Sequence, residues 1–196
     1  LFSNDDLLIV KSLGAEIKPA KNDGMVAVYN KTARLAQARR DFPTVTEEDA
    51  LTRTLMDEVS IENLTATVQH LQDYGRRQYN TSQAYEAGQW IYDQFDNLGL
   101  DVEQFEFTYG VNESSPNVIA TQWGTKYPNK YIVCGSHYDS ERSGHGGQEA
   151  PGADDNATGV ATVLETARIL SQYSFEYTII YCAFSAEEIG LVGSDA

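Results

Sequence analysis

The feature that most constrains the fold is a pair of apolar runs separated by a stretch with helical periodicity. Residues 131–134 form a continuous apolar run, and residues 177–184 form a second, mostly apolar one. Such runs are typical of strands buried on both faces of a sheet. Between them, over residues 158–172, apolar side chains recur at steps of three and four, as on one face of a helix. The order strand, helix, strand predicts a mixed α/β domain with a partly parallel sheet.

Further elements are expected before residue 131. Thr46, Ser60 and residues 80–82 are positioned to begin three helices, because Ser and Thr side chains accept hydrogen bonds from unpaired N–H groups at a helix start. Gly75 and Gly99 are positioned to end the second and third of these helices. The sequence therefore places a helical region ahead of the sheet.

Two more strands are predicted after those helices. Phe105, Phe107 and Tyr109 alternate with other residues, as in a half-buried strand, and residues 117–120 read as another strand. With helices on both sides of the sheet, the predicted fold class is an α/β three-layer sandwich with a mixed, partly parallel sheet.

The first part of the chain has a different character. A turn signal at residues 22–24 predicts a small hairpin, and residues 30–43 are interpreted as a linker or domain edge. We therefore assign residues 1–43 to a propeptide-like or accessory segment and residues 44–196 to the main domain.

Composition excludes several classes of protein. Fourteen Lys and Arg residues against 29 Asp and Glu residues give a formal net charge of -15, which repels phosphate backbones and argues against nucleic-acid binding. No apolar run approaches the length of a membrane span. The two cysteines, Cys134 and Cys182, are too few for a disulfide scaffold or a cysteine-based zinc finger, and we expect free buried thiols.

Polar residues cluster at three places where a predicted strand ends or a predicted helix begins. Such clusters in an α/β sheet gather at the carboxyl ends of the strands. Each cluster alone has an ordinary interpretation: a His–Asp hydrogen bond in a loop, a helix cap, or a solvated acidic turn. Together, so many carboxylates would repel one another unless cations lay between them. The clusters are Gly135-Ser136-His137-Tyr138-Asp139-Ser140, residues 150–159 with the pair Asp154-Asp155, and residues 185–191 with the pair Glu187-Glu188.

The residue types in these clusters suit a metal centre. His137 and Asp139 are two apart in extended chain and point the same way, so the carboxylate can orient an imidazole that binds a metal. Adjacent glutamates diverge, so one of Glu187 and Glu188 can bind a metal while the other holds a proton beside it. A set of oxygen ligands with one histidine favours Zn²⁺ over Mg²⁺, with Mn²⁺ and Co²⁺ left open.

The three motifs GSHYDS, APGADDNATG and AEEIGLVGS resemble those of the zinc-dependent M28 aminopeptidases, and the resemblance extends over residues 58–196. It implies a zinc-peptidase-like fold, two zinc ions in a complete site, a peptide substrate with a free amino terminus, and a cis peptide bond after the bridging aspartate. It also implies a secreted or periplasmic protein. Carried over by motif, His137, Asp155 and Glu188 would bind metal, Asp139 would orient His137, and Glu187 would be the general base and acid.

The family also requires one more acidic ligand and one more histidine, both downstream of these motifs. His70 and His145 are interpreted as a packing or surface residue and as a loop residue, respectively. We therefore expect residues 44–196 to be the amino-terminal part of a catalytic domain, truncated at the carboxyl end and inactive alone. The alternatives are a glutaminyl cyclase-like or carboxypeptidase-like member of the same fold, or a non-catalytic binding domain. The oligomeric state stays open.

Overall fold

The computed structural model describes residues 16–19, 26–29, 50–141 and 150–196. The chain divides into two units, Leu1–Arg53 and Thr54–Ala196, which are described separately. In the first, β1 (Glu16–Pro19) pairs antiparallel with β2 (Val26–Tyr29), as the predicted hairpin requires. The predicted linker at 30–43, the cap at Thr46 and the loop residue His145 lie outside the described residues.

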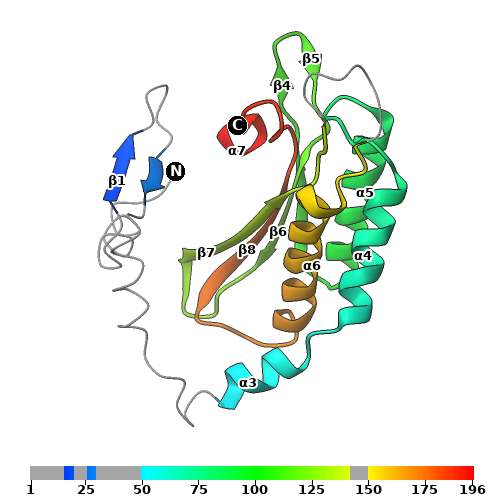
Figure 1. Cartoon of the computed structure of the whole chain (residues 1–196). Helices are drawn as coiled ribbons and strands as arrows, with labels where there is room; N and C mark the ends of the chain where they lie inside the picture. Colours follow the sequence, from blue (N-terminus) through cyan, green and yellow to red (C-terminus); the bar gives the residue numbers. More distant parts are fainter. Residues whose placement is uncertain (1–15, 20–25, 30–49, 142–149) are drawn as a thin grey trace. The chain divides into compact units, whose positions relative to one another are not determined.

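The second unit is built on a four-stranded mixed sheet with the order β3-β6-β8-β7 (Figure 1). The antiparallel part consists of β3 (Asp101–Phe105), β6 (Asn117–Gln122) and β8 (Tyr177–Phe184). The last strand, β7 (Tyr127–His137), runs parallel to β8. The mixed, partly parallel sheet predicted from the sequence is thereby confirmed.

The strand predicted across Phe105, Phe107 and Tyr109 is wrong. β3 ends at Phe105, and a separate ribbon follows, formed by β4 (Thr108–Tyr109) and β5 (Asn112–Glu113). The chain turns back at Gly110, which has a positive φ of 63°. The apolar alternation therefore marks no common buried face, and the side chains of Phe105 and Tyr109 are 41% and 46% exposed.

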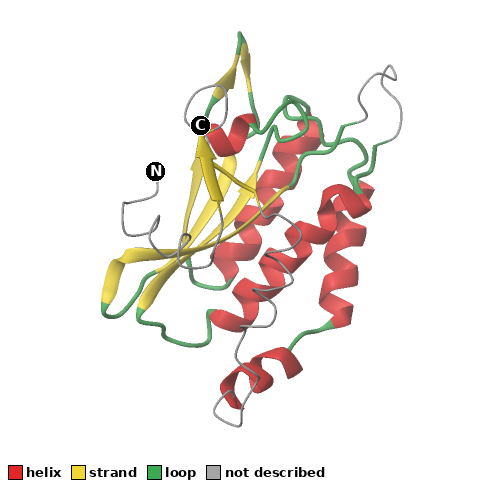
Figure 2. Cartoon of the chain, turned by 60° about the vertical axis from the view of Figure 1, so that its left-hand side comes forward, coloured by secondary structure: helices red, strands yellow, loops and turns green. Residues whose placement is uncertain are grey.

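The helices of the second unit lie mainly along one face of the sheet (Figure 2). α5 packs against β3 and β6, α6 packs against β7 and β8, and α4 packs against α6. The bounds of the helices in this unit are α4 (Ile61–Asp73), α5 (Ser82–Asn97), the π-helical turn η2 (Ala153–Ala157), α6 (Thr158–Leu170) and α7 (Val192–Asp195). A further helix, α3 (Ala50–Asp57), includes the residues on both sides of the boundary between the two units.

Local signals set the ends of α4 and α5 as predicted. Ser60 Oγ accepts a hydrogen bond from Asn63 N at 3.1 Å, and Thr81 Oγ1 accepts one from Ala84 N at 3.4 Å. Gly75 and Gly99 follow the two helices with φ of 73° and 75°, a conformation that glycine adopts without the strain of a side chain.

The core lies between the helices and the sheet. It is made by buried apolar side chains of α5 and α6 against β6 and β8. Of the five residues predicted to face inward on α6, Val160, Val163, Leu164 and Ala167 are buried there, and Leu170 is partly buried against the same core. Of the described helices, none combines the length and the hydrophobicity that crossing a lipid bilayer requires.

The prediction that residues 131–134 are buried on both faces is wrong for three of the four. Tyr131, Ile132 and Val133 are 50%, 53% and 51% exposed. β7 is the last strand in the sheet order, so within the described residues nothing pairs with its outer edge. β8 is buried because it lies between β6 and β7. Cys134 and Cys182 are both free thiols, as expected, and Cys182 is buried, whereas Cys134 is only half-buried.

Candidate metal centre

His137 is the last residue of β7, and its two ring nitrogens face different carboxylates. Nδ1 lies 3.4 Å from Oδ1 of Asp139 and 3.2 Å from the Asp139 backbone oxygen. Nε2 lies 3.1 Å from Oδ1 of Asp155 and 3.7 Å from Oε2 of Glu187. Burial acts to lower the pKa of His137, but the hydrogen bond to Asp139 and the charges of Glu187 and Asp155 outweigh it and raise the pKa.

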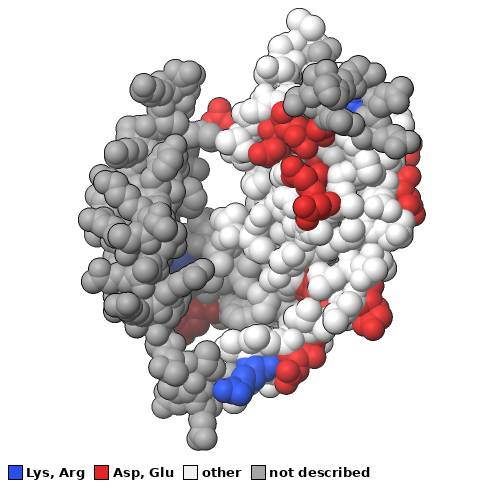
Figure 3. All heavy atoms as spheres, viewed as in Figure 1, with Lys and Arg blue, Asp and Glu red and all other residues white. Residues whose placement is uncertain are grey.

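These four residues differ sharply in exposure. The Asp139 side chain is 1% exposed and that of His137 11%, whereas those of Glu187 and Asp155 are 36% and 77% exposed. Asp139 and His137 thus form the buried part of the cluster, and Glu187 and Asp155 form the part that is open to solvent. Figure 3 shows acidic side chains gathered near the beginning of α6, where Asp155 lies in η2. The peptide bond between Asp155 and Asn156 is cis, as expected from the resemblance.

Asp139 also anchors the acidic turn after β8. Its Oδ1 accepts a hydrogen bond from Glu187 N at 3.1 Å, and its Oδ2 accepts one from Glu188 N at 3.2 Å. The residue before these two glutamates, Ala186, has a positive φ of 58°. This anchoring was missed by sequence reasoning, because the donors are backbone groups that no side-chain motif marks.

Glu188 lies beside the cluster, but its carboxylate has a different partner. Its Oε1 accepts a hydrogen bond from the backbone N–H of Glu141 at 3.2 Å. Burial raises the pKa of Glu188, the bond from Glu141 opposes that shift, and the charges of Asp155 and Asp139 add to it. The structure therefore brings His137, Asp139, Asp155 and Glu187 into one cluster and leaves Glu188 at its border.

Part of this arrangement fits zinc. A tetrahedral Zn²⁺ ion with bonds of roughly 2.0–2.1 Å separates its ligand atoms by about 3.3 Å. The 3.1 Å between Nε2 of His137 and Oδ1 of Asp155 is close to that value. Asp139 on the second nitrogen matches the carboxylate that commonly orients a metal-binding histidine. Within the described ranges, no three His, Cys, Asp or Glu side chains are arranged as a complete metal-holding group.

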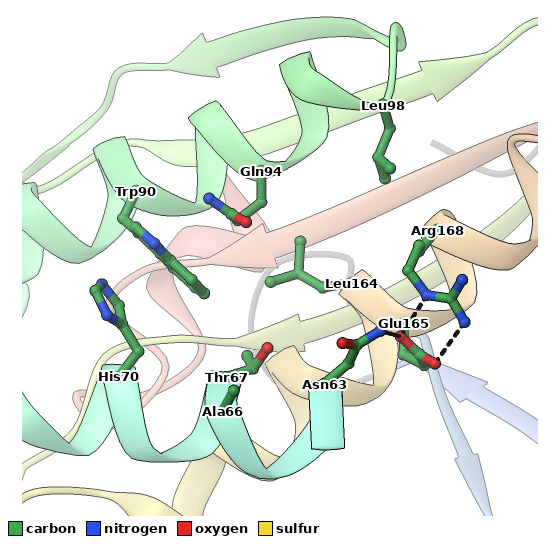
Figure 4. A pocket seen from close by; sticks show the side chains of 10 residues that line it. All are labelled: Asn63, Ala66, Thr67, His70, Trp90, Gln94, Leu98, Leu164, Glu165 and Arg168. Carbon is green, nitrogen blue, oxygen red and sulfur yellow. Dashed lines mark hydrogen bonds and ion pairs between the residues drawn. The ribbon is translucent and has the colours of Figure 1, made fainter. Parts of the chain in front are cut away.

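A cavity of about 370 Å³ lies elsewhere, between α4, α5 and α6. Its lining includes His70, which stacks on Trp90 with ring centroids 4.3 Å apart, and the ion pair of Arg168 with Glu165 (Figure 4). None of the predicted site residues lines it. His70 is thus an exposed residue that stacks on Trp90, which agrees with the packing or surface role that the sequence analysis expected.

The fold is that of the zinc peptidases. The structure resembles the crystal structure of LapB from Legionella pneumophila, with a TM-score of 0.66 and 23% identity, over 96% of this chain and 63% of that one. It also resembles Fimbriiglobus ruber glutaminyl cyclase, with a TM-score of 0.59 and 20% identity, over 66% of this chain and 46% of that one. At such identities the likeness concerns the fold alone.

Sequence comparison identifies the family. The model of peptidase family M28 matches residues 117–196, and these residues belong to that family. A "Probable zinc metalloprotease" of Pyrenophora teres f. teres is 32% identical over 71% of this chain and 35% of its own length. "Leucine aminopeptidase 1" of Ajellomyces capsulatus is 31% identical over 86% of this chain and 46% of its own length. The chain therefore spans less than half the length of these curated relatives.

Proposed function

We propose that the chain forms part of the active site of a zinc-dependent aminopeptidase, which hydrolyses the amino-terminal peptide bond of peptides. The observation that carries this proposal is the His137 imidazole, with Asp155 3.1 Å from one nitrogen and Asp139 3.4 Å from the other. The family of residues 117–196 supports the same chemistry. A secreted or periplasmic location belongs to the same proposal.

The metal-binding roles fall to His137, Asp155 and Glu188, in a complete site with two zinc ions. The side chain of Asp155 is open to solvent, and its carboxylate has two oxygens with which to bridge two cations. Glu188 uses Oε1 for the hydrogen bond from Glu141, which is compatible with metal binding through Oε2. Bound zinc supplies positive charge that polarises the scissile carbonyl and acidifies the attacking water.

The remaining roles belong to Glu187 and Asp139. Glu187 has an open carboxylate at the edge of the cluster, 3.7 Å from His137, where it can take a proton from water and pass it to the leaving amine. Asp139 orients the His137 ring through its Nδ1 atom and holds the backbone of Glu187 in place. One buried carboxylate thereby positions both a ligand and the base.

The test is Glu187→Gln in the full-length protein, assayed on peptides with a free amino terminus. We expect zinc content to stay unchanged and turnover to fall by about 10²–10⁴-fold, the usual contribution of a general base. Glu103→Gln changes an exposed carboxylate on β3 and serves as the control. Turnover within a few-fold of the unmodified protein would remove Glu187 from the base role.

Glutaminyl cyclisation is the second candidate, because one of the similar folds is a glutaminyl cyclase. The same full-length protein, offered peptides that begin with glutamine and peptides that begin with leucine, separates the two reactions. Release of the first residue supports the aminopeptidase. Ring closure without release supports the cyclase, and binding without either reaction supports a non-catalytic domain.

A further inference from the structure

Arg77 is a fully buried arginine in the loop between α4 and α5, and among the described residues the hydrogen bonds of its guanidinium all go to backbone carbonyls. Nε donates to Tyr138 O at 2.7 Å, and Nη2 donates to Gly152 O at 3.1 Å. Nη1 donates to Leu71 O at 2.7 Å and to Pro151 O at 2.6 Å, with Gly75 O at 3.5 Å. The side chain therefore joins the end of α4 to two other segments.

Those two segments carry the candidate ligands. Tyr138 lies between His137 and Asp139, and Gly152 precedes η2, which contains Asp155. The guanidinium thus spans the strand end that holds the histidine and the loop that holds the aspartate.

The backbone of Arg77 reinforces the same junction. Arg77 N donates to Ser140 Oγ at 3.1 Å, and Ser140 N donates to Arg77 O at 3.2 Å. Ser140 Oγ in turn donates to Ala150 O at 2.7 Å. The packing is close: a Cβ on Gly152 would lie 2.8 Å from Nη2 of Arg77 and 2.4 Å from Cβ of Ser140.

A buried charge without a carboxylate partner is costly unless all its donors are satisfied. Burial lowers the pKa of Arg77 to about 10, and the charge of Asp139 opposes this, so the guanidinium stays charged at neutral pH. Its positive charge also offsets the negative charge of Asp139. An apolar side chain of similar size would fill the space but could not bind the carbonyls, so packing alone does not explain an arginine here.

We infer that Arg77 is a positioning residue for the candidate metal centre, which sets the separation of His137 and Asp155 by holding the backbone of both segments. This inference rests on the proposed function. Lysine cannot substitute, because its three N–H donors are on one nitrogen atom. The five N–H donors of guanidinium are spread over three nitrogens in one plane, so they can reach several separate carbonyls.

The test compares Arg77→Lys with Arg168→Lys in the full-length protein. Arg168 also donates hydrogen bonds, to Glu165 at 2.8 Å and to Glu58 O at 2.7 Å. It lies in the last turn of α6, beside the cavity that none of the candidate site residues lines. Zinc affinity is measured by competition with a chelator, alongside thermal unfolding and the separate effects on kcat and KM. We expect Arg77→Lys to weaken zinc binding by about 10–100-fold, as loss of a residue that orients ligands does, and to lower kcat more than it changes KM.

The control variant is expected to lose thermal stability while its zinc affinity stays within about 2-fold. Equal zinc affinity in Arg77→Lys and the unmodified protein would overturn the inference and leave the proposed function intact. A full-length protein that binds no zinc would overturn both.

A second variant covers the case in which Arg77→Lys does not fold. Ser140→Ala removes the hydroxyl that links Arg77 N to Ala150 O and leaves the guanidinium in place. A folded Ser140→Ala protein with weakened zinc binding supports the inference. Unchanged affinity in that variant overturns it.

Discussion

The buried carboxylate of Asp139 accepts a hydrogen bond from the backbone N–H of Glu187 at 3.1 Å. The end of β7 is thereby fixed to the turn that follows β8, although the two residues are 48 positions apart in the sequence. Because β7 and β8 are parallel neighbours, their carboxyl ends meet at one edge of the sheet. A single acidic side chain then determines how the histidine and the glutamate face each other.

Asp139→Asn tests this relationship. Asparagine keeps the size of the side chain but has only one acceptor oxygen, so one of the N–H groups of Glu187 and Glu188 would face an amide donor. We expect the free energy of unfolding to fall by about 1–3 kcal/mol and zinc affinity to fall by about 10–100-fold. Chemical unfolding and chelator competition measure the two effects.

The matched control is Asp96→Asn on the exposed surface of α5, which should change neither quantity appreciably. Zinc affinity that survives Asp139→Asn unaltered would contradict the orienting role of Asp139.

Zinc binding by the 196-residue chain alone is a separate prediction. His137 and Asp155 match two positions of a tetrahedral site, and the part of the chain that the structure describes brings no complete ligand set together. We expect a dissociation constant weaker than about 1 μM, since four-ligand sites gain about 10–16 kcal/mol. Isothermal titration with ZnCl₂ measures it, with His137→Ala as the control. Tight binding of two zinc ions would contradict the expectation of a partial site.

Glu165 gives a prediction about pH. Its carboxylate accepts hydrogen bonds from Arg168 Nε at 2.8 Å and from Ser60 N at 2.7 Å, which ties α6 to the start of α4. The bonds with Arg168 lower the pKa of Glu165 below its ordinary value of 4.5; burial opposes this, and the bond from Ser60 adds to it. A folded-state pKa below the unfolded one means that the stabilisation is present above about pH 4.5 and is lost as the pH falls through the folded pKa.

Glu165→Gln should therefore lower the free energy of unfolding by about 1–3 kcal/mol at pH 7, and the difference should shrink as the pH falls below 4.5. Urea unfolding over this pH range measures it. Glu176→Gln, which breaks an exposed pair with Lys126, should cost under about 1 kcal/mol. A loss for Glu165→Gln that is constant from pH 7 to pH 3 would rule out the carboxylate as its origin.

Local signals explain which parts of the fold could be predicted. The caps at Ser60 and Thr81 and the helical face of α6 depend on residues within one or two turns, so the sequence carries them directly. The exposure of β7 could not be predicted, because an apolar run has the same appearance in a central strand and in an edge strand. Only the sheet order distinguishes the two.

The candidate site divides in the same way. His137, Asp139, Asp155 and Glu187 are chemically distinctive residues in compact motifs, and they do lie together. The contacts of Arg77 could not be predicted, because its partners are backbone carbonyls, which every residue has. Such contacts depend on how distant segments cross, and the sequence carries no local sign of that.

The exposed strand leads to the last prediction. Ile132 on β7 and Ile179 on β8 are direct neighbours in the parallel register, but they are 53% and 4% exposed. Ile179→Ala should cost about 2–5 kcal/mol, because it removes buried methyl groups and leaves a cavity. Ile132→Ala should cost under about 1.5 kcal/mol, because half of that side chain already contacts water. Urea unfolding of both variants of this chain gives the comparison, and equal losses would mean that a further strand or a second copy covers β7 in solution.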